Sequence, residues 1–365
     1  MSFGAQADIR LDALKHNLDI LKATVPGCKV MAAVKANAYG HGLLNIARSL
    51  SQTDALAVAR LSEAVTLRRA GIDQDIVVLG GFLDREELEL SLEHNCTLVV
   101  HSEYQVKLLQ EAGATPGRIW LKIDTGMNRL GVSVDSAKAL LARLRQCGCG
   151  HQLGLMTHLA SADDVDDPMS DTQLQRFVAL TDDFEGDVSV ANSAALLGWG
   201  SKINAVGRST NSGDQWIRPG ISLYGISPLR SGTGKDFNLQ PVMRFESVLI
   251  AVKPVREGDC VGYGGHWVAE RDSVLGIVAA GYGDGYSRFL PSGTPLLLNG
   301  RRVPLAGVVS MDMCAVDLGP DASDRIGDRV VLWGADLPVE EIALHAQTTA
   351  YPLVCGVIDR EGRLQ

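Results

Sequence analysis

The sequence predicts an α/β protein, with a (β/α)8 TIM barrel over residues 1–232 followed by a mainly β domain over residues 233–365. Two observations predict this fold class. From residue 29 to about residue 225, eight short apolar runs alternate with stretches of helical periodicity, which is the order of elements in a parallel barrel. After about residue 228 the runs are rich in Val and Leu and are separated by Gly, Pro and Asp, as in an antiparallel sheet.

The barrel elements can be assigned in chain order. The expected strands are KVMAAVKA (29–36), ALAVAR (55–60), DIVVLGG (75–81), TLVVHS (97–102), IWLKIDTG (119–126), LGLMTH (153–158), VSVANS (188–193) and IRPGISLYG (217–225). Between them, Leu and Val recur at three- and four-residue spacing, which predicts helices over residues 62–71, 85–95, 102–113 and 135–148. One more amphipathic helix, over residues 11–21, precedes the first strand. The polar, Gly-rich stretch over residues 198–215 is expected to be an extended surface loop.

The β domain is predicted from five further runs. They are FESVLIAVKPV (245–255), SVLGIVAAG (273–281), PLLLNGRRVPLAG (295–307), MCAVDL (313–318) and DRVVLWG (328–334). The pair Asn299-Gly300 lies between two apolar stretches and predicts a hairpin, because both residues tolerate the positive φ of a tight turn. A Ser- and Gly-rich stretch over residues 227–238 is expected to link the two domains.

Charge and composition argue against several classes of partner. The 365 residues carry a net charge of −9, and Lys and Arg form no cluster, so neither nucleic acid nor an anionic membrane is expected to bind. The chain does not open on a signal peptide, and no apolar run is long enough to span a bilayer, so a cytoplasmic location is expected. The seven cysteines lack the spacing of a zinc or redox motif, and no metal site is predicted.

A barrel places its reactive groups at the carboxyl ends of its strands. The candidates at the expected strand ends are Lys35, Asn37, Tyr39 and His41 at the first; Lys122, Asp124 and Arg129 at the fifth; His158 at the sixth; Asn192 and Ser193 at the seventh; and Arg218, Pro219, Gly220 and Ile221 at the eighth. Several cations, a lysine in an apolar run and small-residue turns suit an anionic cofactor that carries a carbonyl group.

Lys35 is the most informative of these residues. It lies in the run VMAAVKANAYGHG, and lysine is seldom buried in an apolar segment without a purpose. Desolvation lowers the pKa of an amine and prepares it for Schiff-base chemistry. Taken by itself, Lys35 is interpreted equally well as a lysine at the solvent end of the strand that forms an ion pair with a carboxylate.

The residues around Lys35 resemble a known family. The string VKANAYGHG (34–42) is similar to the pyridoxal-phosphate signature of the alanine racemases. Six further strings resemble motifs of that family, in the family's order. They are KIDTGMNRLG (122–131), MTH (156–158), NSA (192–194), RPGISLYG (218–225), GYGDGY (281–286) and SMD (310–312). Members of the family combine a barrel with a β domain, which agrees with the layout predicted above.

The resemblance implies an isomerase that uses pyridoxal 5'-phosphate to interconvert L- and D-alanine. Lys35 would hold the cofactor and act as one of two bases. Tyr282, from the partner subunit of a homodimer with shared active sites, would be the other. Racemisation needs an acid–base group on each face of a planar carbanion, and a tyrosine needs cationic neighbours to act as a base.

Further roles follow from the same resemblance. Arg218 would face the pyridine nitrogen and, because a guanidinium keeps its proton, would leave that nitrogen unprotonated. This weakens the ring as an electron sink and is expected to suppress transamination. His158 would order Arg218, and Arg129 would bind the cofactor's phenolic oxygen. Lys122 matches a lysine that relatives often carry as a carbamate; a carbamate or a chloride would offset its repulsion from Arg129.

The remaining implied residues hold the phosphate or line the substrate's side of the site. The expected cofactor-binding residues are Tyr39, Asn192, Ser193, Tyr351 and the backbone amides of Gly220 and Ile221. Arg129, with Met311 and Asp312 of the partner subunit, would contact the substrate. Two places depart from the family pattern: the chain after Tyr351 lacks the usual basic, Pro-containing ending, and the stretch 200–214 is longer than expected.

Four other functions are alternatives to racemisation of alanine. A cofactor-carrier protein would share the barrel but not residues 236–365. A pyridoxal-phosphate decarboxylase typically has a carboxylate where this chain has Arg218. A racemase of broader specificity, acting on serine or other amino acids, is the closest alternative, although Met311, Tyr282 and Tyr351 would make a tight pocket that favours alanine. A non-enzymatic binding protein would not need Lys35 and Tyr282 together. D-Alanine would supply cell-wall peptidoglycan or be degraded as a nutrient.

Overall fold

The computed structural model describes residues 4–113, 116–146, 152–207, 213–358 and 360. Eight parallel strands form a barrel wall, which pairing between β5 and β6 closes into a ring. In chain order these strands are β2 (Lys29–Ala33), β3 (Ala55–Val58), β4 (Asp75–Val78), β5 (Thr97–Val100), β6 (Ile119–Asp124), β8 (Leu153–Met156), β9 (Val188–Ser189) and β10 (Gln215–Ile217). Each of the eight predicted runs contains or overlaps one of them, which confirms the barrel.

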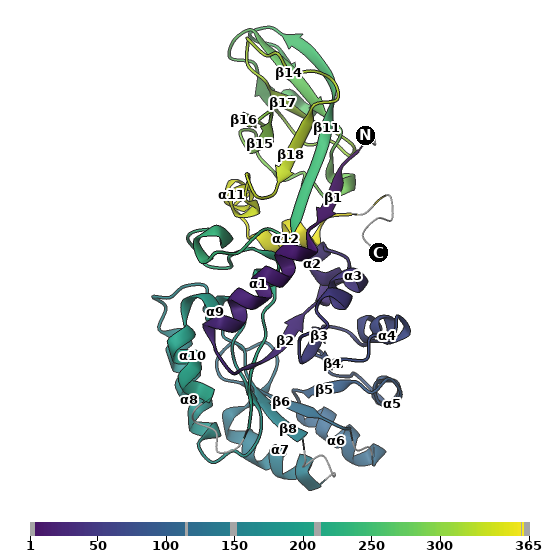
Figure 1. The fold of residues 1–365 in the computed structure, drawn as a ribbon, viewed down its shortest axis with the longest axis vertical. Helices are drawn as coiled ribbons and strands as arrows, with labels where there is room; N and C mark the ends of the chain where they lie inside the picture. The colour runs from purple at the N-terminus through teal and green to yellow at the C-terminus, as the bar shows by residue number, and fades with distance from the viewer. Residues whose placement is uncertain (1–3, 114–115, 147–151, 208–212, 359, 361–365) are drawn as a thin grey trace.

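Amphipathic helices cover the outside of the barrel (Figure 1). They are α1 (Leu11–Thr24), α3 (Leu43–Ser49), α4 (Leu61–Arg69), α5 (Arg85–Glu93), α6 (Glu103–Ala112), α7 (Val134–Gln146), α8 (Met169–Thr181), α9 (Ser193–Gly198) and α10 (Gly200–Gly207). In α6, Ser102 caps the first turn by accepting the N–H of Gln105, and Gly113 ends the helix in the left-handed conformation. Val106 and Leu109 of this helix are fully buried, so its apolar side packs on the strands.

The barrel interior is filled with side chains. Trp120 of β6 and Trp216 of β10 meet edge to face, with ring centroids 5.8 Å apart. They pack with buried side chains of neighbouring strands, including Met31, Val77 and Val99. This packing fixes the positions of the strand ends, where the predicted site residues lie.

The structure corrects the prediction for residues 198–215. Gly200–Gly207 form helix α10 and not an extended loop. Ile203 and Val206 lie three positions apart and are both buried, so the segment packs as an amphipathic helix although its Gly, Ser and Asn content is typical of a loop. Residues 208–212 of the expected loop lie outside the described part of the chain.

The second part of the chain forms an antiparallel sheet with the strand order β16-β15-β18-β11-β14-β17. Its strands are β11 (Met243–Val255), β14 (Ser273–Val278), β15 (Pro295–Leu298), β16 (Arg301–Pro304), β17 (Cys314–Asp317) and β18 (Arg329–Trp333). The five predicted runs are confirmed, and β15 and β16 form the predicted hairpin, with φ of 47° at Asn299 and 78° at Gly300. A short pair, β12 (Cys260–Val261) and β13 (Trp267–Val268), and helices α11 (Val339–His345) and α12 (Ala350–Cys355) belong to the same part.

The contacts that join the barrel and the β domain include a strand pairing and a helix packed at the mouth of the barrel. Strand β1 (Gln6–Ile9), which the sequence analysis did not predict, pairs with β11. Helix α12 lies against the turn α2 (Lys35–Gly40), which follows β2 at the mouth of the barrel (Figure 1). We keep the boundary between the two domains at residues 232 and 233 as a proposal. Strand β1 lies before the barrel in the sequence but pairs with the sheet of the β domain. No helix in the described ranges is long and apolar enough to cross a bilayer.

Candidate active site

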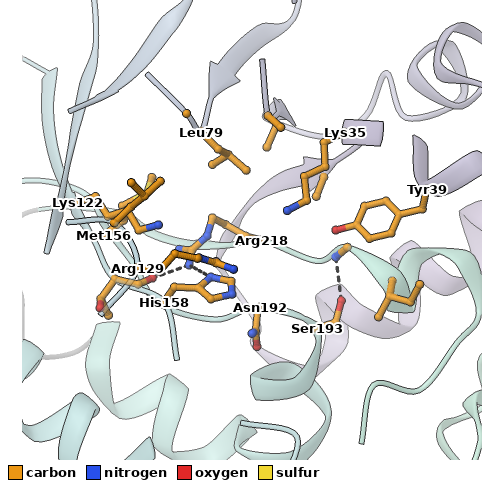
Figure 2. Close-up of a pocket in the computed structure, with 18 of the residues that line it drawn as sticks. Lys35, Tyr39, Leu79, Lys122, Arg129, Met156, His158, Asn192, Ser193 and Arg218 are labelled. Atoms are coloured by element: carbon orange, nitrogen blue, oxygen red, sulfur yellow. Dashed lines mark hydrogen bonds between the residues drawn. The ribbon is translucent and has the colours of Figure 1, made fainter. Parts of the chain in front are cut away.

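A cavity of about 510 Å³ lies at the carboxyl ends of the barrel strands. The barrel residues to which the family resemblance assigns a role all line it, together with Tyr351 of α12, whereas the strand-end candidates Asn37, His41, Asp124 and Pro219 do not. The lining residues with an assigned role are Lys35, Tyr39, Lys122, Arg129, His158, Asn192, Ser193, Arg218, Gly220, Ile221 and Tyr351. Figure 2 shows the side chains of Lys35, Lys122 and Arg218 gathered around the same space.

The lining of this cavity is strongly cationic. Lys35, Lys122, Arg129 and Arg218 contribute basic side chains, and no Asp or Glu is among the described residues that line it. Burial, followed by the charges of Arg129 and Arg218, lowers the pKa of Lys35. Burial and the same two arginines lower the pKa of Lys122 to about 8. Like charges held this close favour neutral amines and an anionic ligand.

Lys35 is presented by a left-handed turn of backbone. Strand β2 ends at Ala33, and α2 follows with φ of 53° to 54° at Ala36–Tyr39 and 82° at Gly40. For L-residues this conformation costs roughly 1–2 kcal/mol each, so tertiary contacts have to stabilise it. The sequence predicts Lys35 within the strand. In the structure the turn carries Lys35 and Tyr39 near its two ends, and both line the cavity (Figure 2).

Arg218 follows β10 and is buried. Its Nη1 donates to Ser189 Oγ at 2.5 Å, and its Nη2 donates to the carbonyl oxygens of Thr157 at 2.6 Å and Val190 at 3.1 Å. Burial lowers the pKa of Arg218 to about 10, so the guanidinium stays charged at neutral pH. His158 Nδ1 lies 3.5 Å from Nη2. Burial, and then the charge of Arg218, lowers the pKa of His158 well below its ordinary value, so this histidine is neutral.

Hydroxyl and amide groups form a polar end of the cavity. Ser193 Oγ accepts the N–H groups of Gly220 at 2.8 Å and Ser222 at 3.2 Å. A Cβ at position 220 would lie 2.5 Å from Tyr39 Oη, so a side chain there would have to displace the Tyr39 hydroxyl. The ring of Tyr39 lies 6.2 Å from that of Tyr351. This set of small polar groups suits the oxygens of a phosphate.

Two predicted strand-end residues shape the backbone around the cavity. Asp124 Oδ1 accepts the N–H of Gly126 at 2.9 Å and so folds the loop that leads to Arg129. Asn192 lines the cavity, and its Oδ1 caps α9 by accepting the N–H of Ala195 at 2.9 Å. These bonds hold the loops after β6 and β9 in place.

The residues expected from a partner subunit lie in the β domain of this chain. None of Tyr282, Met311 and Asp312 is among the described residues that line the cavity. The N–H of Tyr282 donates to the carbonyl of Ser310 at 3.0 Å, and that of Gly283 donates to the carbonyl of Met311 at 2.8 Å. The two segments are therefore joined, and the residues Tyr282 and Met311 are 37% and 53% exposed.

The cavity wall also includes residues that the sequence analysis did not name. Ala57 and Ala59 belong to or follow β3, and Leu79 and Gly80 follow β4. The rule that reactive groups lie at the carboxyl ends of barrel strands also applies to these four residues, because β3 and β4 end at the mouth of the barrel. Small and apolar side chains carry no chemical signal of their own, which is why they were missed.

Comparison with known proteins identifies the family. The family model described as the N-terminal domain of alanine racemase matches residues 9–228, and that of the C-terminal domain matches residues 242–364. An alanine racemase of Vibrio atlanticus is 47% identical over 98% of this chain and 97% of that protein. One of Shewanella loihica is 47% identical over 97% of both. The chain belongs to the alanine racemase family.

Solved structures of the alanine racemase family share this architecture. The biosynthetic enzyme of Pseudomonas aeruginosa matches with a TM-score of 0.92 and 39% identity over 98% of both chains. The enzyme of Bartonella henselae, solved with covalently bound pyridoxal phosphate, matches with a TM-score of 0.86 and 27% identity over 98% of both chains. The cavity described above fits such a group, because it offers an amine with a lowered pKa, three further cations and a polar end for a phosphate.

Proposed function

We propose that this chain interconverts L- and D-alanine, with pyridoxal 5'-phosphate held at Lys35. The lining of the cavity carries the proposal: a partly desolvated amine, three further cations and no carboxylate among the described lining residues. Such a site suits an anionic cofactor that condenses with an amine. The match to alanine racemases over nearly the whole chain supports alanine as the substrate.

The bound cofactor would supply an electron-withdrawing ring that weakens the bond between the substrate's Cα and its proton. Lys35 Nζ would move this proton on one face of the substrate. The lowered pKa of Lys35 supports this role, because it enlarges the fraction of neutral amine that can accept a proton. The opposite face needs a second group, and we propose Tyr282 Oη of a partner subunit.

We propose a homodimer in which each subunit completes the site of the other. Tyr282 is exposed and outside the cavity of its own chain, whereas racemisation needs two groups around one substrate. The guanidinium carbon of Arg288 lies 5.9 Å from the ring centroid of Tyr282 and 5.7 Å from that of Tyr263. The guanidinium of Arg288 thus lies over the faces of both rings. Met311 and Asp312 would reach the substrate with Tyr282.

The remaining residues would orient the cofactor. Arg218 would face the ring nitrogen and keep it unprotonated, and neutral His158 would order the guanidinium. Tyr39, Asn192, Ser193, Tyr351 and the backbone of Gly220 and Ile221 are the groups we assign to the phosphate end.

Lys122 and Arg129 would act as a pair at the phenolic oxygen of the cofactor. With a pKa of about 8, about a tenth of the Lys122 amine is neutral at pH 7. We propose that Lys122 carries a carbamate, whose negative charge would hold Arg129, or that a chloride takes this place.

We propose the cytoplasm as the location of the protein. The five cysteines in the described part of the chain are free thiols, which suits a reducing compartment. There the enzyme would supply D-alanine for peptidoglycan or degrade it.

An absorbance spectrum, followed by polarimetry with L-alanine, tests the proposed function. We expect the visible band of lysine-bound pyridoxal phosphate, its loss in Lys35→Ala, and loss of optical rotation as D-alanine forms. L-Serine in place of L-alanine tests the broader specificity. A band without racemisation of either amino acid would favour a cofactor carrier or a decarboxylase. No band after addition of the cofactor would overturn the proposal.

A further inference from the structure

Two side chains outside the cavity bind the backbone of α2. His41 follows the turn and is 1% exposed; its Nδ1 lies 2.8 Å from the carbonyl oxygen of Tyr39 and 3.1 Å from that of Ala38. Because both partners are acceptors, Nδ1 carries the proton and donates it. Glu63 of α4 binds the other end of the turn, where its Oε1 accepts the N–H of Ala36 at 2.7 Å.

The ring of His41 is itself held in place. It packs on Tyr224 with the ring centroids 4.4 Å apart, and Tyr224 Oη donates to the carbonyl of Ala33, the last residue of β2, at 3.0 Å. Burial lowers the pKa of His41 to about 4, so the ring is neutral at pH 7 and has one proton to donate. The donor is therefore fixed relative to the strand that leads into the turn.

One N–H can bind two successive carbonyl groups only if both point the same way. In a helical turn the carbonyls of Ala38 and Tyr39 do so, whereas in an extended chain they point to opposite sides. The hydrogen bonds of His41 therefore select the turn over the extended conformations that Ala36–Tyr39 would otherwise favour.

We propose that His41 is a positioning residue whose Nδ1–H holds the carbonyl groups of Ala38 and Tyr39 in the turn α2 and thereby sets the Lys35 amine and the Tyr39 hydroxyl relative to each other. Glu63 secures the opposite end of the same turn. This inference deepens the proposed function and rests on it, because Lys35 and Tyr39 are the residues assigned to the cofactor. Without the donor, only the fraction of molecules that keep the turn would bind the cofactor.

Three variants separate this hydrogen bond from packing. His41→Phe keeps an aromatic ring against Tyr224 but removes the donor, and His41→Asn keeps an amide N–H near the position of Nδ1. His16→Phe is the matched control, because His16 Nε2 also bonds a backbone carbonyl, that of Asn238 at 2.8 Å. Neither His16 nor Asn238 lines the cavity.

The first readout is the dissociation constant of pyridoxal phosphate, measured by titrating full-length protein freed of cofactor. The second is hydrogen exchange of the backbone amides of residues 36–42. We expect His41→Phe to raise the dissociation constant about tenfold or more, which corresponds to a turn formed about a tenth of the time, and to speed exchange. His41→Asn should recover most of both properties, and His16→Phe should change neither.

A wild-type dissociation constant and wild-type exchange in His41→Phe would overturn the inference, even if the thermal midpoint falls, because a merely structural histidine changes stability alone. If His41→Phe does not fold, Glu63→Ala replaces it, since this change removes the oxygen that accepts the N–H of Ala36. An unchanged dissociation constant and exchange in Glu63→Ala would then overturn the inference that side-chain bonds to α2 set the position of Lys35. Failure of the wild-type protein to take up the cofactor would overturn the proposed function, and this inference with it.

Discussion

Arg218 is a single residue that we expect to affect both the reaction in the cavity and the stability of the fold. It donates to Ser189, Thr157 and Val190, and we propose that it faces the ring nitrogen. In Arg218→Glu a carboxyl group could share a proton with that nitrogen, so the ring would draw electrons more strongly and more pyruvate would form by transamination. The free energy of unfolding should fall by about 1–3 kcal/mol for each buried carbonyl left without a donor.

The measurement for Arg218→Glu is the ratio of pyruvate formed to alanine racemised, together with a urea unfolding curve. Arg218→Lys is the matched control, because it keeps a positive charge at the same place. It should lose stability without a rise in the ratio. An unchanged ratio in an Arg218→Glu protein that still binds the cofactor would contradict the proposed role.

The occupancy of a carbamate on Lys122 is expected to depend on pH. The pKa of this lysine is about 8 because burial and then the charges of Arg218 and Arg129 disfavour the protonated amine. Only the neutral amine reacts with carbon dioxide, so a Lys122 carbamate should become more occupied as the pH rises through about 8 and less occupied below it. Carbon-13 NMR in labelled bicarbonate measures this occupancy. A signal that is independent of pH, or that persists in Lys122→Ala, would contradict the prediction.

The site residues that the sequence could predict are those whose side chains carry a chemical signal. Lys35 stands out because an apolar run does not explain a lysine. The sequence could not predict that Ser193 would accept the N–H of Gly220, or that Glu63 would reach Ala36. These contacts depend on how separate strands and helices pack together, which no local pattern encodes.

A substitution at Gly40 tests how much the packing of the turn α2 against α12 contributes to stability. The φ of Gly40 is 82°, and a Cβ at this position would overlap with the carbonyl oxygen of Val354 in α12. Gly40→Ala therefore has to displace α12, and Tyr351 with it, from the mouth of the barrel. We expect a loss of several kcal/mol in the free energy of unfolding and a weaker affinity for pyridoxal phosphate.

Gly71→Ala is the matched control for Gly40→Ala. Gly71 has φ of 78°, but nothing lies within 4 Å of a Cβ built there. This substitution should therefore lose only the roughly 1–2 kcal/mol that a left-handed L-residue costs. Urea unfolding and cofactor titration of both variants measure the difference. Equal losses would mean that the contact between α2 and α12 does not stabilise the protein.

Elements with a clear hydrophobic period were the predictable ones, and helix α10 and strand β1 are two unpredicted elements that lack one. Among the residues of α10 whose burial the structure describes, Ile203 and Val206 are the buried ones, and its glycines match the composition of a loop. Strand β1 is four residues long, too short for an alternating pattern to be recognised. Its partner β11 begins more than two hundred residues later, so no neighbouring residue indicates that the strand exists.

The proposed sharing of sites between two chains can be tested by mixing variants. Lys35→Ala and Tyr282→Phe should each be inactive alone. In a mixed dimer, one site combines the native Lys35 of one chain with the native Tyr282 of the other, and the second site carries both substitutions. Random association of equal amounts should therefore restore about a quarter of the wild-type racemase activity.

A control for mixing pairs Tyr282→Phe with a chain that carries both substitutions, because no site in that mixture has a native Tyr282. It should stay inactive. No recovery in the first mixture, when mass spectrometry detects mixed dimers, would argue that each chain completes its own site. Full activity of Tyr282→Phe alone would contradict the role of Tyr282 as a base.

The pairing of β1 with β11 has a consequence for synthesis on the ribosome. Gln6 is opposite Glu246, so the partner of β1 is translated only after the entire barrel. At roughly 5–20 residues per second, the first strand waits on the order of ten seconds or longer for its neighbour. The barrel can assemble during this interval, but the sheet of the second domain cannot be completed. Some of the first residues to leave the ribosome are thus among the last to reach their native positions.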